Sequence, residues 1–384
     1  MWTDGPFAYG FFARYLDVFD GVRAVARVRP ADRADTALVR ADGPGVEFDA
    51  APYYVGPWQY LRALPRVAQA AKRAAHSRDQ AVILRAPSEI NLAARRLVRS
   101  GFVRRGSRGD LGTPARPARS RIRCAPLHVS AIPVPCAPSA DRLVATTYVT
   151  AQALQRRYPP AAEERLHHAL FERPSCPRPP SPPPAQPFRS SLLRLITVGS
   201  MEHLYKGPDV LLEALAGLPE ERLALVGDGR CRASLEALAA KLGLANRVEF
   251  LGPLPAGAAV RQALDRADLF VLPSRQEGLP RAMIEAMARG LPCIGSNVGG
   301  IGELIPADCL APAGDAQALR AKIRALANDP SRLAREAAAN LACARDYHED
   351  VLRRGVRLLR RSAAAGPRPL ELKQPSPAQP IKTT

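Results

Sequence analysis

The sequence predicts an α/β protein built on a doubly wound parallel sheet, and two observations support this prediction. Short apolar runs with a Gly or Pro at their exit recur through the second half of the 384-residue chain. Segments with apolar residues at helical spacing lie between these runs. Strand–helix alternation of this kind indicates parallel βαβ units, which bind ligands on the loops at the carboxyl ends of their strands.

The elements of the second half follow one another in regular order. The apolar runs predict buried strands at 194–199, 222–227, 247–252, 268–273 and 291–296. The helical patterns predict helices at 208–218, 232–244, 258–267 and about 280–289. Pro280 suits the first turn of the last helix, and Gly290 suits its end.

The first half is less regular but also suits an α/β domain. We expect helices at 11–19 and 58–76, with Pro65 breaking the second, and strands at 22–30 and 81–87. Residues 101–140 are rich in Arg, Pro and Gly and show neither helical nor strand periodicity.

Composition and charge limit the class of protein. The formal net charge is +19, and residues 51–200 hold 24 Lys and Arg against 7 Asp and Glu, which favours either an anionic partner or a solvated basic surface. Seven widely spaced cysteines without a Cys-x-x-Cys pair predict neither a disulfide framework nor a zinc site, so we expect a cytoplasmic protein. No apolar stretch is long enough to span a bilayer, and the first residues lack a signal-peptide pattern.

The strand ends of the second half carry polar residues suited to a sugar nucleotide. Lys206 beside a helix start suits a phosphate, and carboxylates suit vicinal hydroxyls. The candidate residues are Lys206, Gly207, Asp228, Glu277, Glu285, Gly299, Gly300 and Glu303. Four of these charged residues have an alternative interpretation: Lys206 as a solvated lysine, Asp228 as a turn residue, Glu285 as a helix-surface residue and Glu303 as a cap.

Several ordered motifs resemble one known family. "YKGPDVLLEAL", "LVGDG", "VEFLGPLP" and "PSRQEGLPRAMIEAMARGLPCIGSNVGGIGELI" resemble the donor-binding domain of family 4 glycosyltransferases over residues 194–345. The resemblance implies a GT-B fold, in which two Rossmann-like domains face a cleft, and retention of configuration at the transferred sugar. It implies a UDP- or GDP-type donor and no metal or other cofactor.

The resemblance also implies roles for individual residues. Glu277, with the amides of Gly278 and Leu279, contacts the transferred sugar, Glu285 binds the donor ribose, and Lys206 binds the diphosphate. Glu277 and Lys206 are therefore the candidate catalytic residues. The expected donor-binding set is completed by Gly199, Gly207, Asp228, Gly299, Gly300 and Glu303. Many members have an Arg where this chain has Ser200-Met201, and Arg230 and Arg275 are the candidates to replace it.

The expected organisation follows from these patterns. We expect an N-terminal acceptor-side domain at 1–173, a Pro-rich linker at 174–190, the donor-binding domain at 191–345, a C-terminal helix at 346–365 and a disordered tail at 366–384. The family begins with a strand and a glycine-rich turn that this sequence lacks, so we expect an incomplete first domain. The composition of 101–140 and 171–190 favours either a reading-frame error or a disordered basic insertion.

These expectations lead to a glycosyltransferase that acts on a sugar or lipid-linked acceptor in cell-surface polysaccharide or glycolipid synthesis. The alternative is a catalytically impaired sugar-nucleotide-binding protein with a damaged acceptor domain. The basic segment 58–76 suggests peripheral contact with an anionic membrane. A specific nucleic-acid partner is not expected, because aromatic residues are not interleaved with the basic ones.

Overall fold

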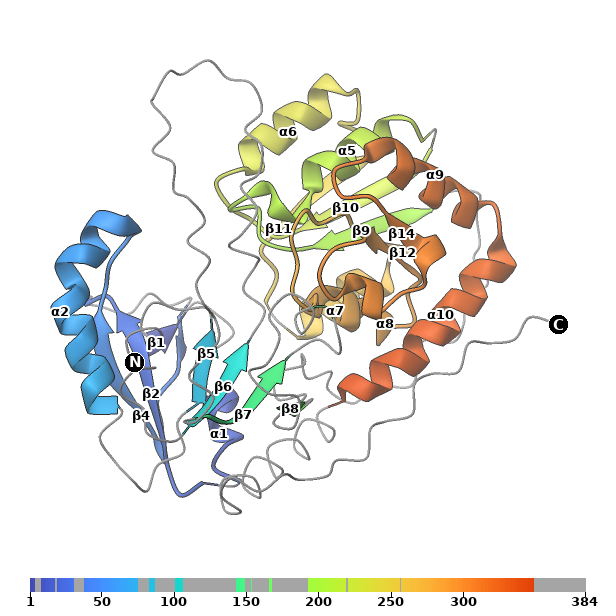
Figure 1. Cartoon of the computed structure of the whole chain (residues 1–384). Helices are drawn as coiled ribbons and strands as arrows, with labels where there is room; N and C mark the ends of the chain where they lie inside the picture. Colours follow the sequence, from blue (N-terminus) through green and yellow to red (C-terminus); the bar gives the residue numbers. More distant parts are fainter. Residues whose placement is uncertain are drawn as a thin grey trace.

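The computed structural model shows two lobes, each built around parallel strands (Figure 1). It describes residues 1–3, 8–17, 19–30, 38–74, 83–86, 101–105, 143–148, 153, 166–167, 193–218, 220–255 and 257–348.

The second lobe is organised around a six-stranded, fully parallel sheet. Its strands are β9 (Arg194–Val198), β10 (Arg222–Val226), β11 (Val248–Gly252), β12 (Leu269–Leu272), β13 (Cys293–Ser296) and β14 (Leu310–Ala311). They lie in the order β11-β10-β9-β12-β13-β14, so the chain starts in the middle, builds to one edge and returns to the other side of β9. This doubly wound order places the topological switch point between β9 and β12.

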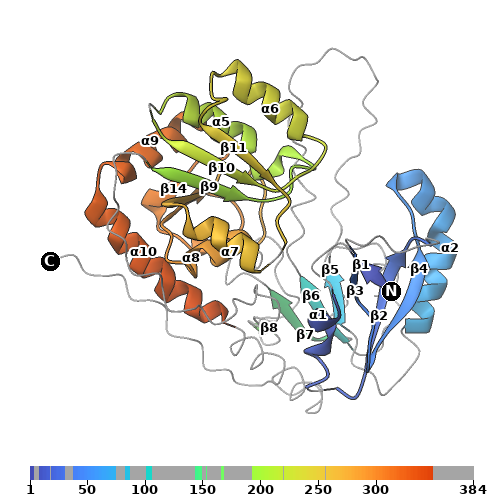
Figure 2. The same cartoon turned by 180° about the vertical axis from the view of Figure 1, so that it is seen from behind.

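Helices cover both faces of this sheet, as Figures 1 and 2 show. They are α5 (Pro208–Ala216), α6 (Arg232–Lys241), α7 (Ala258–Asp265), α8 (Arg281–Met287), α9 (Ala316–Ala327) and α10 (Pro330–Ala344). One apolar cluster joins α5, α6 and α9 to the sheet, and a second joins α7 and α8 to the opposite face. Neighbouring residues of β12 alternate between them, since Phe270 belongs to one cluster and Val271 to the other.

The sequence predictions for this lobe are largely confirmed. All five predicted strands and all four predicted helices are present, and their ends differ from the predicted ones by at most three residues. The patterns did not identify β14, α9 or α10. Strand β14 is only two residues long, too short for a recognisable apolar run.

The first lobe contains two separate parallel sheets and a short antiparallel pair. Strands β2 (Val22–Val28) and β4 (Val46–Pro52) pair in parallel, and β1 (Trp2–Thr3) pairs with β3 (Val39–Arg40). The second parallel sheet has the order β5-β6-β7-β8. Its strands are β5 (Ile83–Ala86), β6 (Gly101–Arg105), β7 (Leu143–Tyr148) and β8 (Leu166–His167).

Three expectations for the first lobe were wrong. The helix predicted at 11–19 is only α1 (Tyr9–Ala13), followed by a turn. Pro65 does not break helix α2 (Gly56–Ala74), because tertiary contacts hold it on both sides of the proline. On the N-terminal side of Pro65, the ring of Tyr60 packs against that of Tyr54, with 5.1 Å between the ring centroids. On the C-terminal side, Val67 is fully buried.

The third error concerns residues 101–140, whose first five residues form β6. This strand is paired on both sides, by β5 and by β7, and such pairing is invisible to local periodicity. The rest of that segment lies outside the described residues. So do the predicted linker at 174–190, nearly all of the helix predicted at 346–365, and the tail at 366–384. Within the described residues, every helix is too short or too polar to cross a bilayer.

Candidate donor site at the sheet switch point

Two loops meet where the strand order of the second lobe reverses. One follows β9 and contains the short 3-10 helix η3 (Leu204–Lys206), and the other follows β12 and leads into α8. The Arg275 amide donates to the Tyr205 carbonyl at 2.7 Å, which joins the two loops directly. Residues distant in the sequence are therefore held side by side at the edge where open α/β sheets bind ligands.

Gly207 makes this close approach possible. Its φ is +70°, and a Cβ at this position would lie 2.0 Å from the Pro273 carbonyl oxygen. Only glycine satisfies both the left-handed backbone and the missing space. Gly207 also precedes α5, whose first residue is Pro208. The glycine thus turns the chain after Lys206 into a helix while the loop stays against β12.

Lys206 and Glu277 form an ion pair between these loops. Their Nζ and Oε2 atoms are 2.5 Å apart, and the Glu277 side chain is only 9% exposed. The buried Ser274 hydroxyl donates to the same Oε2 at 3.3 Å. Gly199 lies beside the stem of Lys206, since a Cβ on it would be 3.3 Å from the Lys206 Cγ. The two residues expected to act on the donor are therefore in direct contact.

Arg275 supports the loops rather than facing a ligand. Its guanidinium makes a bidentate pair with the Asp209 carboxylate, both contacts at 2.7 Å, and also donates to the Leu204 carbonyl. The hydrogen bonds to Asp209 raise the pKa of Arg275. With these donors engaged, Arg275 is poorly placed to replace the arginine missing at Ser200-Met201.

Gly278 and Leu279 present free amides beside Glu277. Neither amide donates a hydrogen bond within the part of the chain that the structure describes. The Leu279 side chain is 7% exposed and packs in the core, so only its backbone is available. Two free amides next to an ion-paired carboxylate can bind the oxygens of a polar ligand.

Gly299 and Gly300 bring a third loop against this one. A Cβ on Gly299, whose φ is +55°, would lie 1.9 Å from the Glu277 carbonyl oxygen. The Gly300 amide donates to the Gly278 carbonyl at 2.6 Å. The sequence placed these glycines in the expected donor-binding set, and in the structure they lie against the backbone of the Glu277 loop. Their observed contribution is to fix the position of Glu277.

Glu285 lies on α8, eight residues after Glu277, and is half-buried. Burial raises the pKa of its carboxyl, and Arg281 and Arg261 lower it in part. Within the described residues its carboxylate accepts no hydrogen bond. A half-buried carboxylate without a hydrogen-bond donor is suited to accept bonds from ligand hydroxyls.

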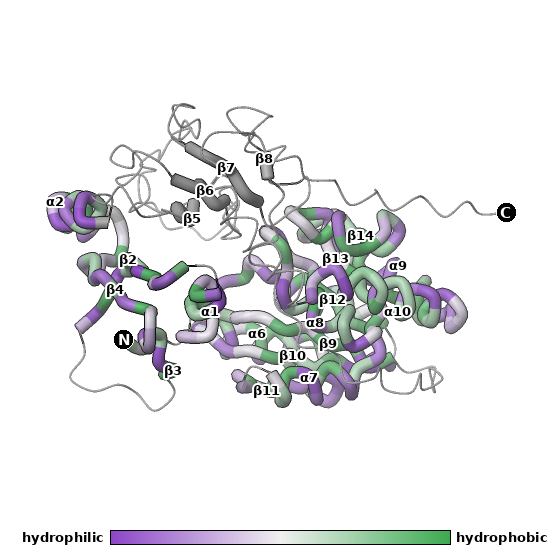
Figure 3. The backbone as a smooth tube through the Cα atoms, turned by 90° about the horizontal axis from the view of Figure 1, so that it is seen from below, coloured by the Kyte–Doolittle hydropathy of each residue, from purple (hydrophilic) through white to green (hydrophobic). Residues whose placement is uncertain are grey.

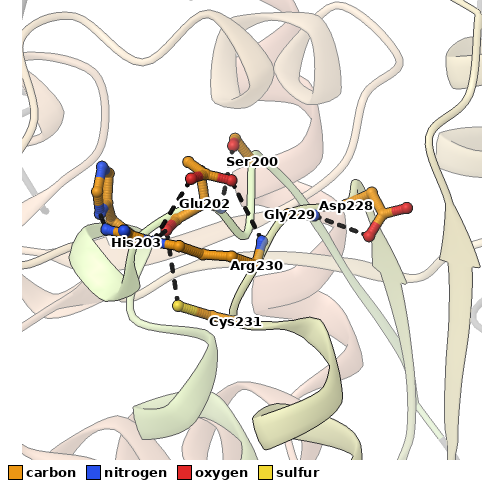
Figure 4. A network of polar contacts seen from close by, with 7 residues as sticks. All are labelled: Ser200, Glu202, His203, Asp228, Gly229, Arg230 and Cys231. Atoms are coloured by element: carbon orange, nitrogen blue, oxygen red, sulfur yellow. Dashed lines mark hydrogen bonds and ion pairs between the residues drawn. The ribbon is translucent and has the colours of Figure 1, made fainter. Parts of the chain in front are cut away.

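Asp228 and Arg230 belong to a neighbouring network that braces the loop after β9 (Figure 4). Asp228 accepts a hydrogen bond from the Gly229 amide at 2.8 Å, which is the turn role that the sequence offered as the alternative for this residue. Arg230 donates to the Glu202 carbonyl at 2.7 Å and contacts His203. The exposed Arg230 is thus bound to its own neighbours instead of being free for phosphate.

Glu303 makes a contact that the sequence could not indicate. Its Oε1 accepts a hydrogen bond at 2.6 Å from the backbone amide of Ala153, which is 150 residues away. A cap role for Glu303 would keep its carboxylate on its own turn. Instead, the carboxylate joins the second lobe to a residue of the predicted acceptor-side domain.

One further polar cluster lies away from these loops. Asp308, Cys309 and Glu336 place potential metal-ligand atoms within 4.8 Å of one another. The Arg332 guanidinium lies among them, 2.5 Å from Asp308 and 3.9 Å from Glu336. Burial raises the pKa of the Cys309 thiol to about 11, so it stays protonated at neutral pH. An arginine therefore supplies the positive charge in this cluster.

Sequence reasoning missed Ser274 and Asp209. Ser274 lies within the motif that contains Glu277, but a serine in a loop does not by itself indicate a function. Asp209 has the position of an ordinary carboxylate in the first turn of a helix. Ser274 lies three residues before Glu277, and the turn of their shared loop brings its hydroxyl to that carboxylate. Asp209 lies 66 residues before Arg275, and only the fold brings these two side chains together.

Comparison with known proteins assigns this lobe. Residues 193–329 match the family described as Glycosyl transferases group 1. This segment is a glycosyl transferases group 1 domain. It contains both loops of the switch point and the Lys206–Glu277 pair.

Relatives and solved structures extend this assignment. The chain is 37% identical over 142 residues to an amylovoran biosynthesis glycosyltransferase of Erwinia amylovora, and the match covers 34% of this chain and 34% of that protein. The first curated relatives are matched over only 14 to 34% of their own length.

Two solved structures match over most of the chain. Sucrose-phosphate synthase from Thermosynechococcus elongatus has a TM-score of 0.69 at 19% identity, covering 93% of this chain and 92% of that one. Anabaena HepE in complex with UDP-glucose has a TM-score of 0.56 at 19% identity, covering 84% and 86%. The GT-B fold expected from the sequence is therefore confirmed.

Proposed function

We propose that the protein is a retaining family 4 glycosyltransferase that moves a sugar from a nucleoside-diphosphate sugar to a hydroxyl acceptor. The observation that carries this proposal is the Lys206–Glu277 pair at the switch point, beside the free amides of Gly278 and Leu279. The group 1 domain and its amylovoran relative support a role in polysaccharide or glycolipid synthesis. The UDP-glucose in the Anabaena structure makes UDP-sugars the first donors to test, before GDP-sugars.

In this proposal, each part of the site meets a different part of the donor. Lys206 and the helix start behind Gly207 stabilise the negative charge of the diphosphate, which grows as the sugar leaves. Glu277 and the amides of Gly278 and Leu279 bind the hydroxyls of the transferred sugar. Glu285 accepts hydrogen bonds from the ribose. The site needs no metal, because Lys206 and the amides supply the positive potential.

Transfer exchanges one bond at the sugar carbon for another. The bond from the anomeric carbon to the diphosphate oxygen breaks, and a bond to the acceptor oxygen forms on the same face. The acceptor hydroxyl gives its proton to the departing diphosphate, so atoms and charge balance. The chain contributes mainly by stabilising charge and by holding the donor in position, and these two effects dominate catalysis of this kind.

Transfer and hydrolysis assays with a panel of UDP- and GDP-sugars test this function. We expect Glu277→Ala to lower turnover at least about a hundred-fold, since it removes a buried charged contact to the transferred sugar. Glu249→Ala is the matched control, because Glu249 is an exposed carboxylate on β11.

The possible results separate the two functions considered. If the Glu249→Ala variant keeps donor turnover and the Glu277→Ala variant loses it, the result supports the glycosyltransferase. Donor binding by calorimetry without any turnover would instead favour a binding protein with an impaired acceptor side. Absence of binding to every donor in the panel would contradict both.

A further inference from the structure

Helix α2 in the first lobe exposes large apolar side chains on its outer face. Trp58 is 76% exposed, Leu61 56% and Leu64 39%. Successive helical residues are about 100° apart, which places these three within an arc of about 120°. Scattered exposed leucines are normal, but a tryptophan and two leucines on one helical arc form a continuous apolar strip.

The same helix is strongly basic. Its 19 residues contain no Asp or Glu, and Arg62, Arg66 and Lys72 are exposed. None of these three has an acidic partner within the described residues, whereas Arg73 pairs with Asp49 at 3.2 Å. At about 100° per residue, Arg62 and Arg66 flank the apolar strip on the side of Trp58, and Lys72 lies within it. Positive charge therefore borders an outward apolar surface.

Packing against the lobe determines which face of α2 points outward. Val67, Ala70 and Ala71, which lie on the arc of α2 next to the strip, are fully buried. Gln59 accepts a hydrogen bond from the Val55 amide at 2.8 Å and fixes the start of the helix. Figure 3 shows α2 at the outer edge of the first lobe, with hydrophilic and hydrophobic residues both along its length.

We propose that α2 binds the surface of an anionic lipid bilayer. Trp58, Leu61 and Leu64 enter the interfacial region, and Arg62, Arg66 and Lys72 contact the lipid phosphates. An amphipathic helix with Trp and Leu beside Lys and Arg is suited to lie in the plane of a membrane interface. The absence of any carboxylate on α2 removes the repulsion that an anionic surface would otherwise meet.

Other occupants fit this face less well. In a symmetric dimer the same patch would meet itself, which brings the arginines of one copy against those of the other. A nucleic acid would use the cations but would leave Leu61 and Leu64 without a binding role. A bilayer interface satisfies the charges and the apolar strip together. The proposal stands independently of the transfer reaction.

Vesicle flotation of the full-length protein tests the electrostatic part. We expect binding to phosphatidylcholine vesicles that contain phosphatidylglycerol, and little binding to phosphatidylcholine alone. The triple variant Arg62→Gln, Arg66→Gln, Lys72→Gln should bind on the order of a hundred-fold more weakly, because each cation near such a surface contributes about a factor of five. The control is Arg222→Gln, Lys241→Gln, Arg266→Gln, which removes the same charge from exposed positions in the other lobe.

Tryptophan fluorescence tests the apolar part. The chain has two tryptophans, so Trp2→Phe leaves Trp58 as the sole reporter, and Trp58→Phe leaves Trp2. We expect the emission of Trp58 to shift to the blue and to be quenched by brominated lipid. The emission of Trp2 should change little. The double variant Trp58→Ser, Leu61→Ser should bind the vesicles about ten-fold more weakly. It should still fold, because both side chains are exposed.

Each contrary result overturns the proposal. Equal losses in both triple variants would indicate general attraction through net charge. Loss of binding in the α2 triple variant with unchanged Trp58 emission would indicate a polyanion site, such as one for RNA. A dimer in sedimentation velocity that Trp58→Ser dissociates would assign the strip to a second copy. Failure of the wild-type protein to float with anionic vesicles would exclude a membrane role.

Discussion

Lys206 and Glu277 determine the electrostatics of the candidate site at the scale of single residues. A carboxylate that is 9% exposed is unfavourable without a partner, and Lys206 at 2.5 Å supplies one. A bound diphosphate would compete with Glu277 for the Lys206 ammonium group, so donor binding should weaken the ion pair between the two residues. The pair therefore compensates the buried charge of Glu277, and in the proposed function Lys206 is the cation that meets the diphosphate.

Ser274 orients this pair, and its loss should affect turnover more than binding. Ser274→Ala removes a buried hydrogen bond to Glu277, and bonds to charged groups contribute about 1.5–3 kcal/mol. We expect kcat to fall about ten-fold with little change in the donor KM. Ser234→Ala is the control, since Ser234 makes its hydrogen bond within the α6 turn. An unchanged kcat for Ser274→Ala would mean that the hydroxyl has no role in positioning Glu277.

Glu285 should make stability depend on pH. Burial raises its pKa in the folded state above the ordinary value of 4.5, so the unfolded chain loses this proton first as pH rises. The free energy of unfolding then falls across the window that begins near 4.5 and ends at the raised pKa. Above that window the full penalty remains.

Glu285→Gln should remove this penalty. We expect the variant to have a higher Tm than the wild type at neutral pH, and we expect this difference in Tm to shrink as the pH approaches 4.5. Thermal unfolding monitored by circular dichroism measures both values. The same variant should bind the donor more weakly if Glu285 accepts ribose hydroxyls. Exposed Glu249→Gln should show neither effect. A Tm gain that does not vary with pH would contradict the electrostatic explanation.

At the scale of elements, the site depends on how closely loops approach. The loop after β9 contacts the loop after β12 at Gly207, and the loop after β13 contacts the latter at Gly299. In both places a side chain would collide with a carbonyl oxygen. Glycines at these positions therefore allow the loops after three strands to pack together, and this packing places the residues of the candidate site.

Gly207→Ala should destabilise the protein more than its backbone angle alone explains. Gly243→Ala is a matched control, because Gly243 has φ of +71° against +70° and a Cβ added to it would have no atom within 4 Å. We expect Gly243→Ala to cost roughly 1 kcal/mol in unfolding free energy. Gly207→Ala should cost more than about 3 kcal/mol, measured by urea unfolding. Equal costs would show that the loops separate easily.

At the scale of the whole molecule, Glu303 connects the group 1 domain to the rest of the chain. Its bond to the Ala153 amide is a long-range contact with the predicted acceptor-side domain. In the proposed transfer reaction, the two lobes must meet for donor and acceptor to react. The contact therefore links the first lobe to a residue near the loops of the candidate site.

Glu303→Ala should loosen this link locally. We expect faster hydrogen–deuterium exchange in the peptide that contains Ala153, because its amide loses its acceptor. Peptides from α2 should exchange at the wild-type rate, since α2 packs on β4 instead. Unchanged exchange at Ala153 would mean that the amide has another acceptor or that the bond does not persist in solution.

The sequence alone was sufficient to predict that the second lobe is an α/β domain with a parallel sheet. Apolar runs closed by Gly or Pro predicted β9 to β13, and the spacing of Lys206, Glu277 and Glu285 predicted a site at their carboxyl ends. Local patterns were sufficient for these strands and for the four helices between them, because strand and helix alternate regularly there, but they did not identify β14, α9 or α10. They failed at Pro65 and at β6, where distant contacts outweigh local preference.

Only the tertiary structure decided which side chains act on one another. It paired Lys206 with Glu277, engaged Arg275 with Asp209, and placed the glycines at 299 and 300 against protein backbone. It also turned the apolar side chains of the basic helix outward. The physical reason is that sequence periodicity reports which face of an element is buried. Contacts between loops depend on strand order and on missing Cβ atoms, which no local pattern records.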